Sequence, residues 1–241
     1  MSASTMVSVP ENQQHLTAHW DSLNETQRDQ LARQLQNVDF DLMAQLFAGE
    51  DKTIDWEDVA AKAEAPAAFR LDRSENKFSQ EQAIEAGSQA LSQGKVGVIL
   101  VAGGQGSRLG FDHPKGMYPV GPVSERTLFQ MHIEQLRAVS NKFGVSIPLY
   151  LMTSPATHAE TIEFLEANDR FGLPKSDLKV FCQGTMPAVD AKTGELLLAA
   201  PDQLFLSPDG HGGTLTALDK EGCLADMESR GIEHVLSLIH I

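Results

Sequence analysis

A glycine-rich segment with two nearby cationic side chains is the part of this 241-residue sequence best suited to chemistry. Residues 103–110 spell GGQGSRLG, and residues 114–117 spell PKGM. Glycine lets the backbone approach a ligand without interference from a Cβ atom, and consecutive N–H groups in such a turn can form an anion site. Arg108 adds a planar, permanently charged donor fork that suits phosphate oxygens, and Lys115 adds a second cation. We interpret the two motifs together as a phosphate-binding loop.

Two widespread phosphate-binding motifs do not fit this loop. The dinucleotide fingerprint requires a glycine three residues after Gly106, where this sequence has Leu109. The P-loop requires Gly-Lys followed by Ser or Thr, and that triplet occurs nowhere in the sequence. A nicotinamide-dependent dehydrogenase is therefore disfavoured. The simplest alternative is a glycine-rich surface turn, but a buried strand before the loop and two cations in it favour ligand binding.

The loop must be positioned by the apolar run that precedes it, Val96–Ala102, which is typical of a central parallel strand buried on both faces. Strands and helices are predicted to alternate after it. The strands are expected over 147–152, over 178–182 and beyond Gly231. The helices are expected to start at Thr127 and at Ser154-Pro155, and a third is expected over about 213–229 with a break at Gly222. This alternation indicates an α/β fold with a doubly wound parallel sheet. Ligands of such sheets bind beyond the carboxyl ends of the strands, where the loop would lie.

Residues 1–92 lack β-rich runs, and we expect them to form an N-terminal helical segment ahead of an α/β domain over 93–241. Apolar residues at 31, 35, 38, 42 and 46 recur at three- and four-residue steps, which predicts one helix over 25–46. Ser79 and Gln82 form a potential capping box for a second helix, which Gly94 would end. An irregular connection is expected over 51–78, and a hairpin over 188–198.

Composition narrows the class of partner. The net charge of -14 argues against non-specific binding to nucleic acid or to an anionic membrane, although local donors can still hold a nucleotide. No apolar run approaches the roughly 18 residues that span a bilayer, and the N-terminus lacks the pattern of a signal peptide. The two cysteines, Cys182 and Cys223, are expected to be reduced thiols. These features predict a cytoplasmic protein with small-molecule partners.

The motifs together resemble the signature of UDP-sugar pyrophosphorylases, most closely of the UDP-N-acetylglucosamine pyrophosphorylase branch. That family shows GGxGTRLG, so Ser107 replaces a threonine and keeps its hydroxyl group. Further matches follow in order: TLFQ at 127–130, MTS at 152–154, QG at 183–184, PA at 187–188 and PDGHGG at 208–213. The resemblance covers about residues 80 to 235. It implies a Rossmann-like nucleotidyltransferase (GT-A-like) domain, incomplete at its C-terminus.

The resemblance implies transfer of uridylyl from UTP to a sugar-1-phosphate, which forms a UDP-sugar and pyrophosphate. Arg108 and Lys115 would be the catalytic residues, because they would neutralise charge on the phosphates. The implied nucleotide-binding residues are Ala102, Gly103, Gly104, Gln183, Gly210 and His211. Gln183 would bond the uracil, since a side-chain amide matches both the donor and the acceptors of an imide edge. The resemblance to this branch favours N-acetylglucosamine-1-phosphate as the sugar substrate. Many close members carry asparagine in place of His211, which weakens the assignment of the sugar, so glucose-1-phosphate stays open.

The resemblance also implies Mg²⁺, held by an aspartate in a Val-Asp-Asn stretch at the end of the strand after Gly231. Here the sequence has IEHV at 232–235 and then LSLIHI at 236–241, without an aspartate. We interpret this as a truncation before the metal-binding segment, and we expect the polypeptide itself to be inactive. His234 and His240 are not assigned as replacement ligands. The alternative from another class is a non-catalytic nucleotide-binding or regulatory protein that lacks the metal site.

Overall fold

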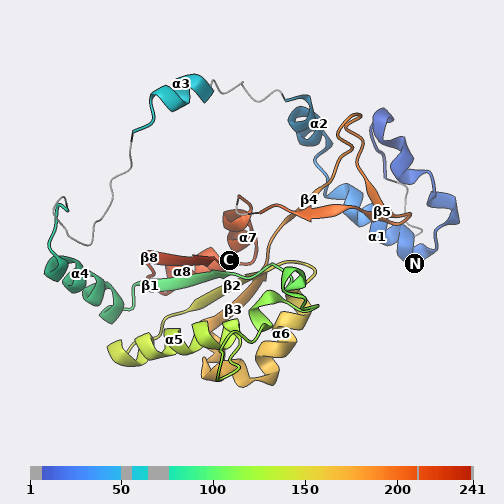
Figure 1. The fold of residues 1–241 in the computed structure, drawn as a ribbon. Coiled ribbons are helices and arrows are strands. Elements are labelled where there is room, and N and C mark those ends of the chain that lie inside the picture. Colours follow the sequence, from blue (N-terminus) through green and yellow to red (C-terminus); the bar gives the residue numbers. More distant parts are fainter. Residues whose placement is uncertain (1–6, 50–55, 65–75, 211, 240–241) are drawn as a thin grey trace. The chain divides into compact units, whose positions relative to one another are not determined.

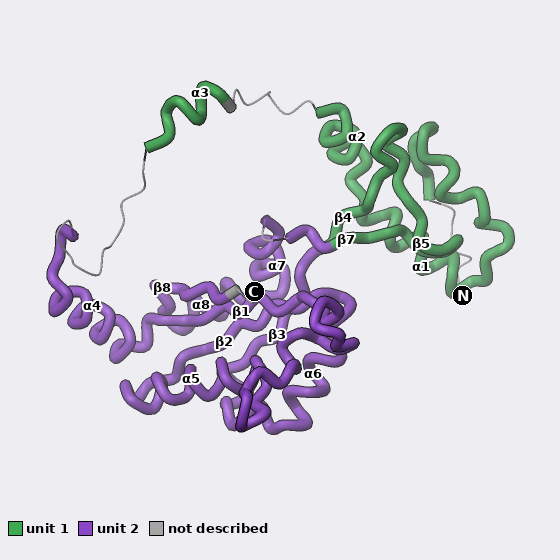
Figure 2. Tube along the Cα trace, viewed as in Figure 1, with its two compact units in different colours: residues 1–68, 185–207 green, residues 69–184, 208–241 purple. Residues whose placement is uncertain are grey.

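The chain forms two compact units, shown in Figure 2. A computed structural model describes residues 7–49, 56–64, 76–210 and 212–239. The first unit combines residues 1–68 with residues 185–207, and the second combines residues 69–184 with residues 208–241. The two units are thus not continuous in sequence. The predicted division after residue 92 follows a change in sequence pattern, and it stays a prediction about domains.

A four-stranded parallel sheet forms the centre of the second unit (Figure 1). Its strands lie in the order β3-β2-β1-β8, with the bounds β1 Val96–Val101, β2 Leu149–Thr153, β3 Leu178–Cys182 and β8 His234–Ile239. Each strand corresponds to one predicted from the sequence, which confirms the α/β fold class. Because the strands are parallel, the residues that follow β1, β2 and β3 meet at one edge of the sheet.

Helices cover both faces of this sheet (Figure 1). They are α4 Gln80–Ser92, α5 Leu128–Phe143, α6 His158–Ala167, α7 Thr214–Lys220 and α8 Cys223–Ser229. Phe129 and Ile133 of α5 pack with Val98 and Leu100 of β1, which point to one face. Ile99, on the opposite face, packs with residues of α7 and α8. The sheet is therefore doubly wound, as the alternation of strands and helices predicts.

The start of α6 differs from the prediction. The helix begins at His158, not at Ser154-Pro155. The Ser154 amide donates to Oγ1 of Thr157 at 3.1 Å, and the Thr157 amide donates back to the carbonyl oxygen of Ser154 at 3.0 Å. These bonds close a separate turn, so the helix starts one turn later than the sequence suggests. The predicted break at Gly222 is confirmed, because Gly222 has φ +67° between α7 and α8.

The first unit is built from short helices and short strand pairs. Its elements are the 3₁₀ helices η1 Glu11–Thr17 and η2 Trp20–Ser22, the helices α1 Glu25–Gln36, α2 Phe40–Ala48 and α3 Trp56–Ala61, and the strands β4 Thr185–Pro187, β5 Leu198–Ala200, β6 Gln203–Leu204 and β7 Leu206–Pro208, of which Pro208 belongs to the second unit. Leu31 and Leu35 of α1 pack with Leu196 and Leu204 in its core.

Two sequence predictions about the first unit are wrong. The single helix expected over 25–46 is interrupted between α1 and α2, because the Asp39 side chain caps a new helix by accepting from the Leu42 amide at 2.9 Å. The segment 51–78 is not wholly irregular, since it contains α3. Part of that segment lies outside the described residues. The hairpin over 188–198 is confirmed by the antiparallel bridge between Val189 and Leu196, and it belongs to the first unit.

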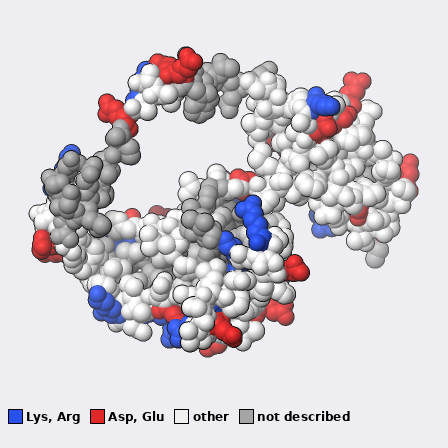
Figure 3. Space-filling view, in the orientation of Figure 1, with Lys and Arg blue, Asp and Glu red and all other residues white. Residues whose placement is uncertain are grey.

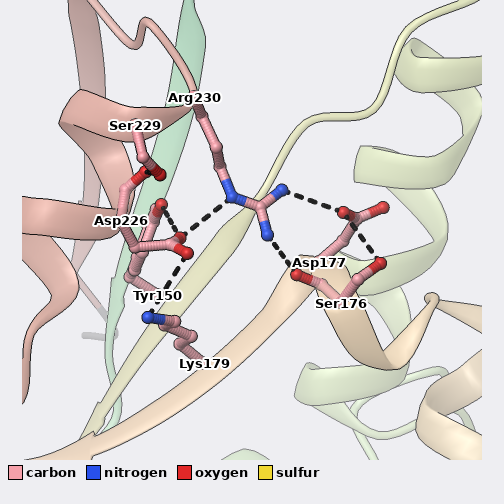
Figure 4. A network of polar contacts seen from close by, with 7 residues as sticks. All are labelled: Tyr150, Ser176, Asp177, Lys179, Asp226, Ser229 and Arg230. Carbon is pink, nitrogen blue, oxygen red and sulfur yellow. Dashed lines mark hydrogen bonds and ion pairs between the residues drawn. The ribbon is translucent and has the colours of Figure 1, made fainter.

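A polar network fixes α8 to the sheet (Figure 4). The Tyr150 hydroxyl donates to Asp226 at 2.7 Å, and Lys179 pairs with the same carboxylate at 3.3 Å. Arg230 donates through Nε to Asp226 at 2.9 Å and through Nη1 to Asp177 at 3.1 Å. Burial disfavours the charged carboxylate, but the bonds from Tyr150 and Lys179 and the charge of Arg230 lower the pKa of Asp226. The network therefore ties α8 to β2 and β3.

Candidate functional site

The glycine-rich loop leaves the carboxyl end of β1 and folds back on itself. Its start is fixed by the Ala102 amide, which donates to the Met152 carbonyl at 2.7 Å. The Gly106 amide then donates to the His113 carbonyl at 2.9 Å, and the Lys115 amide donates to the Gly104 carbonyl at 3.0 Å. The two predicted motifs therefore lie side by side.

Gly106 is required by the close packing of this fold-back. A Cβ atom at Gly106 would lie 2.8 Å from both the ring and the carbonyl oxygen of Phe111. At Gly104, by contrast, a Cβ would meet nothing within 4 Å, which leaves the backbone open on that side. The loop thus combines one glycine needed for packing with another that exposes the main chain to a ligand.

Gly116 fixes the position of Lys115. A Cβ atom at Gly116 would lie 2.1 Å from the Phe129 ring, so only glycine fits between the PKGM segment and the first turn of α5. Phe129 is fully buried in the core of the second unit. The backbone that carries Lys115 therefore rests directly on the core, although its side chain is only half-buried.

Gln183 follows β3 and reaches the loop from the neighbouring strands. Its amide donates to the Thr153 carbonyl at 2.8 Å, which continues the β2–β3 pairing by one residue. Its side-chain Oε1 lies 3.2 Å from the position of a Cβ at Gly103. The side-chain amide of Gln183 is therefore packed against the main chain of Gly103.

These features surround one cavity of about 860 Å³ in the second unit. Of the predicted site residues, the structure places Ala102, Gly103, Gly104, Arg108, Lys115 and Gln183 in its lining. Gly210 does not line it among the described residues, although Pro208 does, and His211 lies outside the described residues. The six predicted residues in the lining together offer main-chain groups, one side-chain amide and two cations to a ligand.

An apolar wall of the cavity was not predicted from the sequence. It is formed by Leu109, Tyr118, Val120 and Leu128. Leu128 belongs to the TLFQ motif, and Tyr118 directly follows PKGM. These two motifs could therefore have indicated part of the apolar wall. The fold of the loop places the Tyr118 ring against the Phe111 ring, with 5.4 Å between their centroids. An apolar wall beside a few placed polar groups is the usual composition of a small-molecule site.

The cavity is locally positive in an acidic protein. Its lining contains Arg108 and Lys115 but no carboxylate, and in the described part of the chain neither cation forms an ion pair with Asp or Glu. On the face shown in Figure 3, the described Lys and Arg residues occur in small separate groups. The charge available to a ligand is therefore local to the cavity, which suits a phosphorylated small molecule better than a polyanion surface.

No group of three or more His, Cys, Asp or Glu residues that could hold a metal ion occurs among the described residues, and the cavity lining contains no Asp or Glu. Mg²⁺ prefers oxygen ligands, usually with one or two carboxylates. No step of the chemistry is therefore assigned to a metal held by these residues.

Among the described helices, none is long and apolar enough to cross a membrane.

A doubly wound sheet with a glycine-rich loop at the carboxyl end of its first strand is an arrangement typical of nucleotide-binding α/β domains. The family model described as UTP–glucose-1-phosphate uridylyltransferase matches residues 39–237. The chain therefore belongs to this family of UDP-sugar pyrophosphorylases.

Individual relatives agree with this family. The chain is 33% identical over 234 residues to UDP-N-acetylglucosamine diphosphorylase 2 of Arabidopsis thaliana, which covers 92% of this chain and 46% of the relative. It is 39% identical over 163 residues to UDP-N-acetylglucosamine pyrophosphorylase of Saccharomyces cerevisiae, covering 66% of this chain and 34% of the relative. The chain thus spans half the length or less of the curated relatives it matches.

Solved structures show the same fold. The UDP-N-acetylglucosamine pyrophosphorylase of Trypanosoma brucei in complex with an inhibitor superposes with a TM-score of 0.74 at 28% identity, covering 95% of this chain and 49% of that one. A putative UDP-N-acetylglucosamine pyrophosphorylase of Entamoeba histolytica gives a TM-score of 0.64 at 32% identity, covering 73% of this chain and 44% of that one. The nucleotidyltransferase fold expected from the sequence is confirmed.

Proposed function

We propose that this chain carries the nucleotide-binding part of an enzyme that makes a UDP-sugar and pyrophosphate from UTP and a sugar-1-phosphate. The observation that supports this most is the single cavity shared by the main chain of 102–105, Arg108, Lys115 and Gln183. Its volume of about 860 Å³ is in the range of sites that hold drug-sized ligands. The family match and the names of the relatives point to the same activity.

The uridine end of the nucleotide is assigned to the Gln183 side of the cavity. An amide side chain offers a donor and an acceptor, and uracil presents an imide N–H flanked by carbonyl oxygens. The neighbouring main chain of Ala102, Gly103 and Gly104 can approach the nucleoside closely, because Gly103 has only a hydrogen where Gln183 packs. Cytosine presents a different donor and acceptor pattern on that edge, so we expect the site to prefer uridine nucleotides.

The phosphates are assigned to Arg108 and Lys115. An oxygen of the sugar phosphate attacks the α-phosphorus of UTP, the bond to the bridging oxygen of the β-phosphate breaks, and pyrophosphate leaves with that oxygen. The attacking phosphate is already an anion at neutral pH, so no general base is required. Catalysis then consists of alignment and of stabilising charge as it shifts to the leaving group. Arg108 suits the β- and γ-phosphates, and Lys115 suits the α-phosphate.

The preferred sugar is proposed to be N-acetylglucosamine-1-phosphate, with glucose-1-phosphate as the other candidate. Several relatives are named for N-acetylglucosamine, whereas the family description names glucose-1-phosphate. Gly210 and His211 are proposed to lie near the nucleoside and sugar. Magnesium stays an expectation from the family, in which it would neutralise phosphate charge when bound. A cytoplasmic location is also proposed, on the basis of the free thiols Cys182 and Cys223.

Nucleotide binding is the most direct test of this function. Isothermal titration calorimetry of the 241-residue chain should show UTP binding that Arg108→Ala weakens by about 10- to 100-fold, because a charge-assisted bond to phosphate contributes roughly 1.5–3 kcal/mol. The matched control is Arg33→Ala, since Arg33 is exposed in the first unit and its Nε donates to the Asp29 carbonyl of its own helix. Equal UTP affinity in wild type and Arg108→Ala would remove Arg108 from the site.

A non-catalytic nucleotide-binding protein is the second candidate function. The observation that favours it is the absence of a carboxylate from the described lining of the cavity. Pyrophosphate release from UTP by the full-length gene product, measured with N-acetylglucosamine-1-phosphate, with glucose-1-phosphate and without sugar, separates the two functions. Sugar-dependent release at millimolar Mg²⁺ supports the transferase, whereas UTP binding without release supports the alternative.

A further inference from the structure

Thr153 is a fully buried polar residue at the carboxyl end of β2, directly beside the cavity lining. Its hydroxyl group donates to the Phe181 carbonyl of β3 at 3.1 Å. The same oxygen lies 2.7 Å from Nδ1 of His158, the first residue of α6. One hydroxyl thus connects β2, β3 and the start of a helix. Neither Thr153 nor His158 lines the cavity, so the proposed transfer does not account for this arrangement.

The proton of the Thr153 hydroxyl determines which way the bond to His158 runs. A carbonyl oxygen can only accept, so the single hydroxyl proton is used by Phe181. Nδ1 of His158 must then carry the proton that it shares with the Thr153 oxygen. Burial, followed by the charge of Glu221, raises the pKa of Cys182, and a side-chain hydrogen bond with Thr153 offsets part of this rise, so a neutral thiol also lies beside the Thr153 hydroxyl.

The turn before α6 places His158 for this bond. The carbonyl oxygen of Ser154 accepts from the amides of Thr157 at 3.0 Å and His158 at 2.9 Å, which folds the chain back over the end of β2. The same turn touches the loop, since the Ser154 amide lies 3.3 Å from the position of a Cβ at Gly103. The late start of α6 is therefore what brings the His158 ring to Thr153.

Loss of the bond between His158 and Thr153 would also affect Gln183, because Thr153 is bonded directly to the end of β3. Thr153 holds β3 twice, through its hydroxyl to Phe181 and through its carbonyl, which accepts from the Gln183 amide at 2.8 Å. Without the donor from His158, the buried hydroxyl oxygen would lose a hydrogen-bond partner, and only its bond to the Phe181 carbonyl and its contact with the Cys182 thiol would orient it. The end of β3 would then be held less firmly, just where Gln183 meets Gly103.

We propose that His158 is a positioning residue that sets the side-chain amide of Gln183, through Thr153, and thereby supports selection of a uridine nucleotide. This inference rests on the proposed function for its ligand, but its structural part concerns only residues of the second unit. His158 touches neither the cavity nor the reacting atoms. Its effect on specificity passes through the paired ends of β2 and β3.

The test compares variants that keep or lose a donor at the position of Nδ1. His158→Leu removes it, whereas His158→Asn keeps an N–H group at nearly the same place. His158→Gln is a second loss variant that stays polar, because its amide reaches past Nδ1. The control is His19→Leu, the same substitution at an exposed histidine of the first unit. For each variant, the side-chain amide resonances of Gln183 are recorded in the ¹⁵N-labelled chain without nucleotide, after assignment by their loss in Gln183→Leu.

We expect His158→Leu and His158→Gln to shift the Gln183 resonances, and His158→Asn and His19→Leu to leave them near the wild-type position. Calorimetry with UTP and CTP should then show the preference for UTP reduced about fivefold to tenfold in the loss variants, the range expected for one buried hydrogen bond, and restored in His158→Asn.

Unchanged Gln183 resonances in a folded loss variant would overturn the positioning role. Shifted resonances with an unchanged preference for UTP would overturn its contribution to specificity. A wild-type chain that binds UTP no better than CTP would contradict the proposed function instead, while the resonance shifts would still report on the link from His158 to Gln183.

Discussion

The side-chain amide of Gln183 packs against the Cα atom of Gly103, so that a Cβ placed there would lie 3.2 Å from Oε1. This contact joins the end of β3 to the loop that follows β1. The Gln183 side chain is proposed to recognise the base, and the Gly103 main chain is proposed to approach the nucleoside. The contact therefore places these two groups next to each other. The distance is tight for an added methyl group, which makes the contact directly testable.

Gly103→Ala should therefore disturb recognition more than folding. The added Cβ must push the Gln183 amide aside by a few tenths of an ångström, and we expect the preference for UTP over CTP to fall several-fold in calorimetry. Gly87→Ala is the matched control, because a Cβ at this position in α4 meets nothing within 4 Å. That control should stabilise the fold by about 0.5–1 kcal/mol. Unaltered nucleotide preference in Gly103→Ala would contradict the role of the contact.

Gly116→Ala should destabilise the second unit. A Cβ at this position would lie 2.1 Å from the buried Phe129 ring, and overpacking of this kind costs about 1–3 kcal/mol. Thermal unfolding should show a lower midpoint for Gly116→Ala, and the double variant with Phe129→Leu should cost less than the sum of the two single variants. Simple additivity of the two free-energy changes would show that the methyl group does not meet the ring.

Asp226→Asn tests the network that holds α8. Because the pKa of Asp226 is lowered in the folded protein, its charge contributes stability that is full above the ordinary value of 3.8 and is lost as the pH falls through the lower folded value. We expect the substitution to cost on the order of 1–2 kcal/mol at pH 7 and progressively less as the pH falls below 3.8, measured by urea unfolding. An equal cost at pH 7 and at the lowest pH would mean that the carboxylate charge contributes nothing.

Tyr150→Phe tests the other end of that network. Burial, with the hydrogen bond to Asp226, raises the pKa of Tyr150 well above its ordinary value of 10.0. The stability linked to this group is therefore full below about pH 10 and falls as the pH rises above it. Wild type should lose stability between pH 9 and pH 11 more steeply than Tyr150→Phe. Parallel unfolding curves for the two proteins would contradict the linkage.

The sequence predicts those parts of the fold that depend on local pattern. β1 can be predicted because a continuous apolar run is typical of a buried strand. The glycine-rich loop can be predicted because a cluster of glycines is typical of a tight loop. The capping box of Ser79 and Gln82 is confirmed because both of its bonds span only three residues. The placement of Arg108 and Lys115 in one cavity follows from their short separation along the chain.

Other features depend on contacts between distant residues and could not be predicted. The hairpin over 188–198 belongs to the first unit because Gln13 bonds to both the Gly194 carbonyl and the Leu196 amide, more than 180 residues away. The interruption between α1 and α2 arises from a side-chain cap at Asp39, which competes with an unbroken apolar periodicity. The link from His158 to Thr153 likewise requires the turn at 154–157, which the sequence suggests as the first turn of a helix.

We propose that UTP lies between Gln183 and the two cations, and chemical-shift mapping of the ¹⁵N-labelled chain can locate the nucleotide. On titration with UTP, the largest shifts should fall on the amides of Gly103, Gly104 and Lys115 and on the side-chain amide of Gln183. CTP should leave the side-chain amide of Gln183 unshifted. Shifts confined to other parts of the chain, or identical responses to UTP and CTP at Gln183, would contradict this placement of UTP.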